Sequence, residues 1–228
     1  MQTTPDFGLI SLVDKGHVRK ARALLEGPHG RQAATAHLGG FRPTALFYLY
    51  DARRLALLPL LLAAGADLEA RNRDEETVLM QRLRRTVSTP QDWEHLKPLL
   101  EAGSNVNAHT QDGRCVLQCW MHGPARDHLF ILDELLERGA SPHAQIPGKP
   151  GPLAVAVMAG MSADIVERLL QAGASPDESD AHGRTAKTWA KSRPDILALL
   201  TSHESRQAAQ ALASALPEPL GSRLKPRL

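Results

Sequence analysis

Residues 61–65 read Leu-Leu-Ala-Ala-Gly, and the same Leu-Leu-x-x-Gly phrase returns at 99–103, 135–139 and 169–173. The glycines of these copies lie 38, 36 and 34 residues apart, and shortened copies occur at 24–27 and 199–200. A phrase that recurs at a nearly constant spacing indicates a chain built from repeated structural units. The two leucines fit the buried end of a helix, and the glycine fits the left-handed position that terminates it.

A second phrase precedes another helix in each unit, with threonine or a substitute for it at the first position. Its copies read Thr44-Ala45-Leu46, Thr77-Val78-Leu79, Cys115-Val116-Leu117, Gly151-Pro152-Leu153 and Thr185-Ala186-Lys187. Threonine is a favoured residue just before a helix, because its hydroxyl accepts a hydrogen bond from a free backbone amide. Each unit is therefore predicted to hold two helices joined by a turn.

Together the two phrases resemble the ankyrin-repeat family, whose unit of about 33 residues carries Thr-Pro-Leu-His in its first helix and Leu-Leu-x-x-Gly-Ala at the end of its second. The resemblance spans roughly residues 6–200, although no unit has the complete Thr-Pro-Leu-His. It implies an all-α solenoid of stacked helix-turn-helix units with projecting hairpin loops. We expect an ankyrin-repeat domain over 1–203, with six units at about 6–29, 41–71, 74–109, 112–145, 148–179 and 182–201. A C-terminal helix and a disordered basic tail are expected over 204–228.

Three features of the sequence depart from the family repeat, and each predicts a local change in structure. Arg82 stands where the family has a small alanine, so either the helix spacing widens there or the side chain reaches outward to solvent. Extra residues within 28–40 suggest a loose loop. Pro59 and Pro98 lie inside expected second helices, which should start near the proline or bend there.

Composition limits the classes of partner. The 228 residues include 27 Lys and Arg against 25 Asp and Glu, with both signs mixed along the chain, so no broad basic field is expected. This argues against nucleic acid or an anionic membrane as the main partner. The N-terminus lacks the features of a signal peptide, and no apolar run reaches the ~18 residues of a membrane span. With only two cysteines, a cytoplasmic location is predicted.

No sequence motif of a hydrolase, zinc protease or phosphate-binding loop is present, so we predict a protein without catalytic activity, cofactor or metal. One cluster leaves an alternative open. Cys115, Cys119 and His122 could place three soft ligands on one side of a helix. Cys115 replaces the inward-facing threonine of the repeat, which favours a buried structural thiol.

The ankyrin resemblance implies that a partner protein binds the hairpin tips and the outer side of the first helices, and we expect binding through the concave face of units two to four. Carried over to this sequence, the candidates are Tyr50, Arg53, Arg54, Arg71, Arg73, Asp74, Glu76, Arg84, Arg85, His109, Gln111, Asp112, Arg114, His122, His182 and Arg184, with Gln145 and Lys149 on a further tip. Reversing the charge of Arg84 and Arg85 is expected to weaken partner binding and to leave folding nearly unchanged. A merely solvated face remains the alternative for the charged tips.

The sequence leaves three alternative functions, each from a different class of protein. The first is an adaptor or regulator that docks another protein, as a monomer or in a one-to-one heterocomplex. The second is an inhibitor, such as an immunity protein that occludes the active site of a bacterial toxin. The third is an effector or enzyme that uses the Cys115, Cys119 and His122 cluster.

Overall fold

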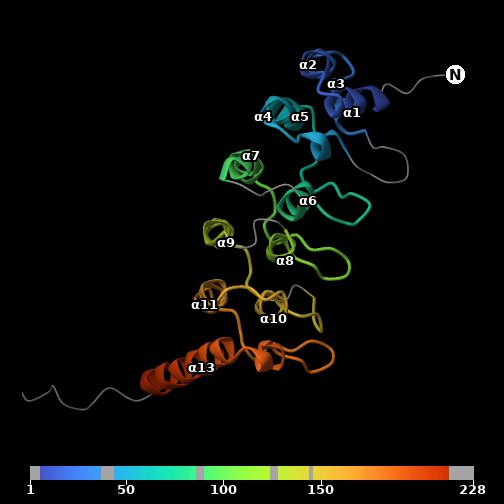
Figure 1. Cartoon of the computed structure of the whole chain (residues 1–228). Coiled ribbons are helices and arrows are strands. Elements are labelled where there is room, and N and C mark those ends of the chain that lie inside the picture. Colours follow the sequence, from blue (N-terminus) through green and yellow to red (C-terminus); the bar gives the residue numbers. More distant parts are fainter. Residues whose placement is uncertain (1–5, 37–43, 86–89, 124–127, 144–145, 216–228) are drawn as a thin grey trace, which may run out of the picture.

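The computed structural model describes residues 6–36, 44–85, 90–123, 128–143 and 146–215. Within these ranges the chain is helical, has no strand, and forms one isolated antiparallel bridge, between His109 and Cys115. Figure 1 shows the helices stacked in two columns along the molecule, with loops projecting from one column to the same side. The expected all-α solenoid is therefore confirmed.

The first column holds the first helix of each unit and carries the projecting loops (Figure 1). Its members are α1 (Asp6–Asp14), the 3₁₀ helix η2 (Ala45–Tyr48), α6 (Val78–Arg85), α8 (Val116–Met121), α10 (Pro152–Met158), α12 (Ala186–Trp189) and the 3₁₀ helix η3 (Ala190–Ser192). Along the column α6 packs against α8, α8 against α10, and α10 against α12.

The second column holds the second helices. Its members are α2 (Val18–Glu26), α4 (Ala52–Leu55), α5 (Leu58–Ala63), α7 (Pro90–Glu101), α9 (Leu129–Glu137), α11 (Ala163–Gln171) and α13 (Pro194–Ala215). Here α11 packs against both α9 and α13. The predicted division at residue 203 falls inside α13, and the part of the expected tail beyond Ala215 lies outside the described residues. The unit boundaries themselves stay a prediction.

The Leu-Leu-x-x-Gly phrase forms the same helix end four times. Gly65, Gly103, Gly139 and Gly173 have φ angles of 91°, 92°, 85° and 98°, in the left-handed region that glycine adopts without strain. In each copy the residue after the glycine donates its backbone amide to the carbonyl of the first leucine, at 2.9, 3.2, 2.9 and 3.0 Å. The repeated sequence thus produces one repeated backbone conformation, which turns the chain out of the second column.

The interior between the columns is one continuous apolar cluster that runs from Leu9 in α1 to Leu200 in α13. Trp120 in α8 is fully buried in it, and so is Cys119 one residue earlier. Each unit buries its apolar side chains against its neighbours, which is how a repeat too thin to fold alone becomes stable.

One expectation for the first units is wrong. Residues 28–40 include the short helix α3 (Gly30–Ala34), whose Ala33 and Ala34 are buried, where a loose loop was expected. A Cβ atom on Gly30 would lie 1.9 Å from the carbonyl oxygen of Leu25, so α3 approaches the end of α2 too closely for a side chain. Of the two alternatives for Arg82, the outward side chain is excluded, because only 4% of that residue is exposed, and the wider helix spacing stays a prediction.

The two prolines behave differently. Pro59 lies in the first turn of α5, as expected, because a first-turn residue needs no amide proton. The helix α7 begins at Pro90 and continues through Pro98. The helix therefore starts eight residues before Pro98 and not near it.

Candidate functional site

Four hairpin tips project from the first column, at residues 72–76, 110–114, 146–150 and 180–184 (Figure 1). Three of them are tied by their own side chains, and the tip at 146–150 is closed by a backbone hydrogen bond from the Lys149 amide to the Ile146 carbonyl at 3.2 Å. Asn72 Oδ1 accepts two backbone amides of its tip at 2.9 and 3.0 Å, and Asp180 Oδ1 accepts two of its own at 2.8 and 3.0 Å. The Thr110 hydroxyl accepts the Arg114 amide at 3.0 Å. The tips are therefore ordered before any partner arrives.

Neighbouring tips are joined through Arg71, one of the predicted partner-binding residues. Its Nη1 donates to the carbonyl of Glu75 at 2.8 Å and to that of His109, in the next unit, at 2.7 Å. His109 is itself half-buried and its Nδ1 lies 3.2 Å from the Thr110 carbonyl oxygen. Both residues hold the tips in register.

The structure places Glu76 inside the protein, where its carboxylate is fully buried. Arg84 forms two hydrogen bonds with it, from Nε at 2.5 Å and from Nη2 at 2.9 Å. Arg114 of the next unit adds a longer contact at 3.4 Å. The hydrogen bond to Glu76 raises the pKa of Arg84. Because two guanidinium groups from adjacent units share one buried carboxylate, this cluster joins the units.

Two further arginine candidates are also held within the fold. Arg54 donates from Nε to the carbonyl of Val13 at 2.7 Å and from Nη2 to that of Asp14 at 2.8 Å, which ties α4 to the end of α1. Arg184 pairs with Asp180 at 2.7 Å and lies 4.9 Å from the centre of the Trp189 ring. Its hydrogen bond lowers the pKa of Asp180 to about 2.

The remaining candidates lie at the surface of the tips and helix ends. They are Tyr50, Arg53, Arg73, Asp74, Arg85, Gln111, Asp112, His122 and His182. Tyr50 is 44% exposed, stands edge-on to Tyr48, and covers the guanidinium of Arg82 at 5.2 Å from the ring centre. Burial raises the pKa of Tyr50 and lowers that of Arg82 to about 10. Gln145 lies outside the described residues.

The cysteines do not meet the needs of a reactive site. Cys115 and Cys119 are free thiols and both are buried, as expected for Cys115. Burial raises the pKa of both thiols, that of Cys119 to about 12, so neither supplies a thiolate near neutral pH. His122 is exposed at the end of α8. Within the described ranges, no group of three or more His, Cys, Asp or Glu residues could hold a metal ion.

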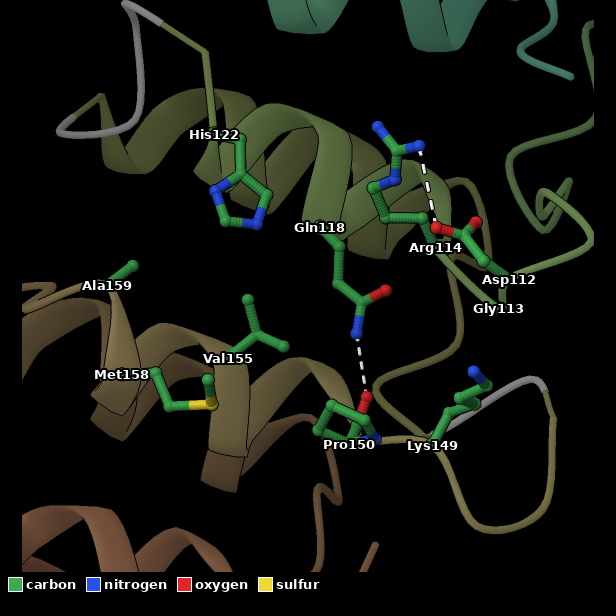
Figure 2. Close-up of a pocket in the computed structure, with 10 residues that line it drawn as sticks. All are labelled: Asp112, Gly113, Arg114, Gln118, His122, Lys149, Pro150, Val155, Met158 and Ala159. Carbon is green, nitrogen blue, oxygen red and sulfur yellow. Dashed lines mark hydrogen bonds and ion pairs between the residues drawn. The ribbon is translucent and has the colours of Figure 1, made fainter. Parts of the chain in front are cut away.

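A pocket of about 350 Å³ crosses the face between α8 and α10, from the hairpin tips to the ends of both helices. It is lined by Asp112, Gly113, Arg114, Gln118, His122, Lys149, Pro150, Val155, Met158 and Ala159 (Figure 2). It brings together four predicted residues, namely Asp112, Arg114, His122 and Lys149. Sequence reasoning missed Gln118, Val155 and Met158, because helical residues of a repeat give no signal of which neighbours leave space beside them.

Gln118 holds the two walls of this pocket together. Its Oε1 accepts the backbone amide of Cys115 at 2.9 Å, and its Nε2 donates to the carbonyl of Pro150 at 2.8 Å. The second of these bonds crosses from α8 to the next unit, as the dashed line in Figure 2 shows. The pocket is therefore a fixed feature of the hairpin side.

No helix among the described residues is long and apolar enough to span a bilayer.

No protein-family model matches the chain. No curated protein matches it either. Among solved structures, an ankyrin repeat domain from Acinetobacter baumannii AYE matches with a TM-score of 0.67 and 20% sequence identity. The match covers 87% of this chain and 98% of that one. Ankyrin-repeat domains typically serve as protein-binding modules. The structural match confirms the architecture expected from the repeated phrases, and the chain has the fold of an ankyrin-repeat domain.

Proposed function

We propose that the chain is a non-catalytic module that binds a partner protein on its hairpin side, acting as an adaptor or regulator. The hairpin side is defined as the four tips together with the exposed surface of the first-column helices from η2 to η3. The observation that carries the proposal is the order of the tips, which are tied internally. Arg71 links the first two tips, and a hydrogen bond from the Ala181 amide to the Gly148 carbonyl links the last two. Surfaces fixed in advance lose little conformational entropy on binding, which favours affinity.

The exposed residues of the hairpin side suit a protein partner. Tyr50 and Arg85 belong to the residue types that most often dominate binding energy at protein interfaces. Gln111 and His182 add exposed polar groups on the tips of the same surface, whereas exposed Arg53 belongs to α4 in the second column. We place the protein in the cytoplasm as part of this proposal, because both cysteines are free thiols and a reducing compartment keeps thiols in that state.

The test is capture of the partner from the cell that produces the protein, followed by calorimetry with the purified partner. Arg85→Glu changes an exposed charge at the end of α6, and Lys97→Glu makes the same change on α7 in the second column. We expect Arg85→Glu to weaken binding about tenfold and Lys97→Glu to leave it unchanged. Equal affinities for both variants would contradict the hairpin side as the binding surface.

The same experiment separates the adaptor from an inhibitor. An inhibitory role requires that the captured partner be an enzyme or toxin and that the chain abolish its activity at a one-to-one ratio. A partner whose activity is unaffected supports the adaptor or regulator. Either outcome keeps the binding module, whereas a reaction catalysed by the chain itself would overturn it.

A further inference from the structure

The pocket between α8 and α10 has two chemically different ends. Figure 2 shows His122, Met158 and Ala159 at one end, and Asp112, Arg114 and Lys149 at the other. At the first end Val155 and Ala159 form an apolar wall, and Met158 is 48% exposed beside them. An exposed methionine adapts its shape to an entering apolar group, because its side chain is unbranched and polarisable.

The charges at the other end are unequally available. Arg114 is paired with Glu76 at 3.4 Å and with Asp112 at 3.6 Å. The Asp112 carboxylate also accepts the Thr110 hydroxyl, and that hydrogen bond lowers the pKa of Asp112. Lys149 is exposed, and among the residues that the structure describes no ion pair joins it to a carboxylate. The net charge offered to a ligand at this end is therefore positive.

Gly113 fixes the position of Lys149. A Cβ atom on Gly113 would lie 2.8 Å from Cγ of Lys149 and 3.3 Å from its Cβ, so the aliphatic part of the lysine packs directly on the glycine backbone. Gly113 also has a φ angle of 88°, which the tip requires. The same glycine therefore shapes the tip and seats the cation at the rim of the pocket.

Several helices of the two columns differ in the sign of their charges, although the sequence as a whole mixes both signs. The first-column helices from η2 to η3 carry five charged residues, all basic: Arg82, Arg84, Arg85, Lys187 and Lys191. In α7, α9 and α11 the charged residues are eight acidic ones against Lys97 and Arg168. Arg84 and Lys187 are paired with carboxylates, whereas Arg85, Lys191 and the rim residue Lys149 are exposed cations, which favours an anionic ligand on this side.

We propose that this pocket receives a large aliphatic side chain of the partner, with a carboxylate next to it in the partner's sequence paired to Lys149. The proposal rests on the proposed protein-binding function and specifies the chemistry of the partner. The aliphatic group fills the space between Val155, Met158 and Ala159. The carboxylate lies at the rim, where pairing removes little water from either charge and contributes mainly to specificity and the rate of association.

The probe is a fluorescein-labelled peptide, Ser-Gly-Glu-Leu-Glu-Gly-Ser, followed by fluorescence anisotropy with the full chain. Two matched peptides replace both glutamates by lysine, or the leucine by serine. We expect the glutamate-leucine peptide to bind about tenfold more tightly than either relative. Equal binding of the three peptides, or no binding of any of them, would overturn the proposal.

Variants of the protein test which residues cause the preference for the glutamate-leucine peptide. Lys149→Glu reverses an exposed charge at a tip, and we expect it to weaken the glutamate-leucine peptide about tenfold and to strengthen the lysine peptide. Met158→Ser should weaken both leucine-containing peptides. Lys97→Glu on α7 is the control and should change neither. An unaltered preference in Lys149→Glu would overturn the assignment of the carboxylate to Lys149.

Nucleic acid is the other anion that a basic column could attract, so a single-stranded oligonucleotide of twelve deoxythymidines is the third arm. We expect it to bind more weakly than the glutamate-leucine peptide, because only the peptide fills the apolar end. Tighter binding of the oligonucleotide would overturn the proposal. Failure of the peptide preference while Arg85→Glu still weakens the captured partner would refute only this pocket chemistry and leave the proposed function intact.

Discussion

The guanidinium of Arg84 forms paired hydrogen bonds with the carboxylate of Glu76, with Nε 2.5 Å from Oε1 and Nη2 2.9 Å from Oε2. None of the Glu76 side chain is exposed, whereas 27% of the Arg84 side chain is. The ankyrin resemblance of the sequence predicts that both residues contact a partner. Their relationship shows that part of the charged surface expected at the tips is instead an internal joint of the solenoid.

Removing Arg84 is expected to destabilise the fold. Arg84→Ala leaves the buried Glu76 carboxylate with two longer contacts, from Arg114 and from the Asn72 side-chain amide, each at 3.4 Å, and an undercompensated buried charge costs about 3 kcal/mol. In a chain of this length that corresponds to a melting midpoint lower by about 6–12 °C. Arg85→Ala, at the exposed neighbouring position, is the control and should stay within about 0.5 kcal/mol. Equal midpoints for the two variants would show that the pair does not support the fold.

Glu75 has a left-handed backbone conformation, and the equivalent position in two other tips is a glycine. Its φ angle is 60°, and the equivalent tip positions Gly113 and Gly183 have φ angles of 88° and 70°. The left-handed region costs a residue with a side chain about 1 kcal/mol, so Glu75→Gly is expected to raise the unfolding free energy by about that amount. Glu75→Ala keeps the strain and should bring no gain. A lower unfolding free energy for Glu75→Gly, measured by urea unfolding, would contradict the claim that the backbone at Glu75 is strained.

Arg82 is a buried cation, and its burial destabilises the charged form relative to water. Its pKa falls to about 10 on folding, so the charged side chain costs stability at every pH below that value. Arg82→Met removes the charge and keeps most of the volume, at the loss of the contact with the Tyr50 ring. We expect the variant to be more stable by about 1 kcal/mol at pH 7. Arg85→Met should be neutral, and a lower melting midpoint for Arg82→Met would refute the prediction.

The Asp180 and Arg184 pair gives a pH dependence with a defined sign. The pKa of Asp180 falls from 3.8 to about 2 on folding, so its contribution to stability is present above pH 3.8 and is lost as pH falls through 2. Asp180→Asn keeps an acceptor for the tip amides and removes the charge. We expect its melting midpoint to lie below that of the parent chain at pH 5–7, and the gap to close between pH 4 and pH 2. A constant gap down to pH 2 would contradict the assignment.

The helices at the repeated phrases could be predicted because residues within each phrase determine where the helix ends. Gly65 and Gly103 end their helices through backbone geometry alone, and their φ angles follow from the residue type. The helix α3 could not be predicted this way. It depends on the approach of Gly30 to the carbonyl of Leu25, a contact that no helix propensity encodes.

The candidate site was harder to foresee, because its residues are sorted by contacts across units. Arg54 reaches Val13, 41 positions earlier, and Arg71 reaches His109, 38 positions later. Such arginines look identical in sequence to exposed Arg53 or Arg85. The pocket likewise arises where α8 and α10 face each other, and neither helix alone indicates a space beside Met158.

The central claim is that a partner protein docks on the hairpin side, and hydrogen–deuterium exchange of the chain with and without the captured partner tests it most directly. We predict protection at tips 72–76, 110–114, 146–150 and 180–184 and at the ends of α6, α8 and α10, with α7, α9 and α11 unchanged. Protection confined to α7, α9 and α11, with the tips exchanging as in the free chain, would contradict it.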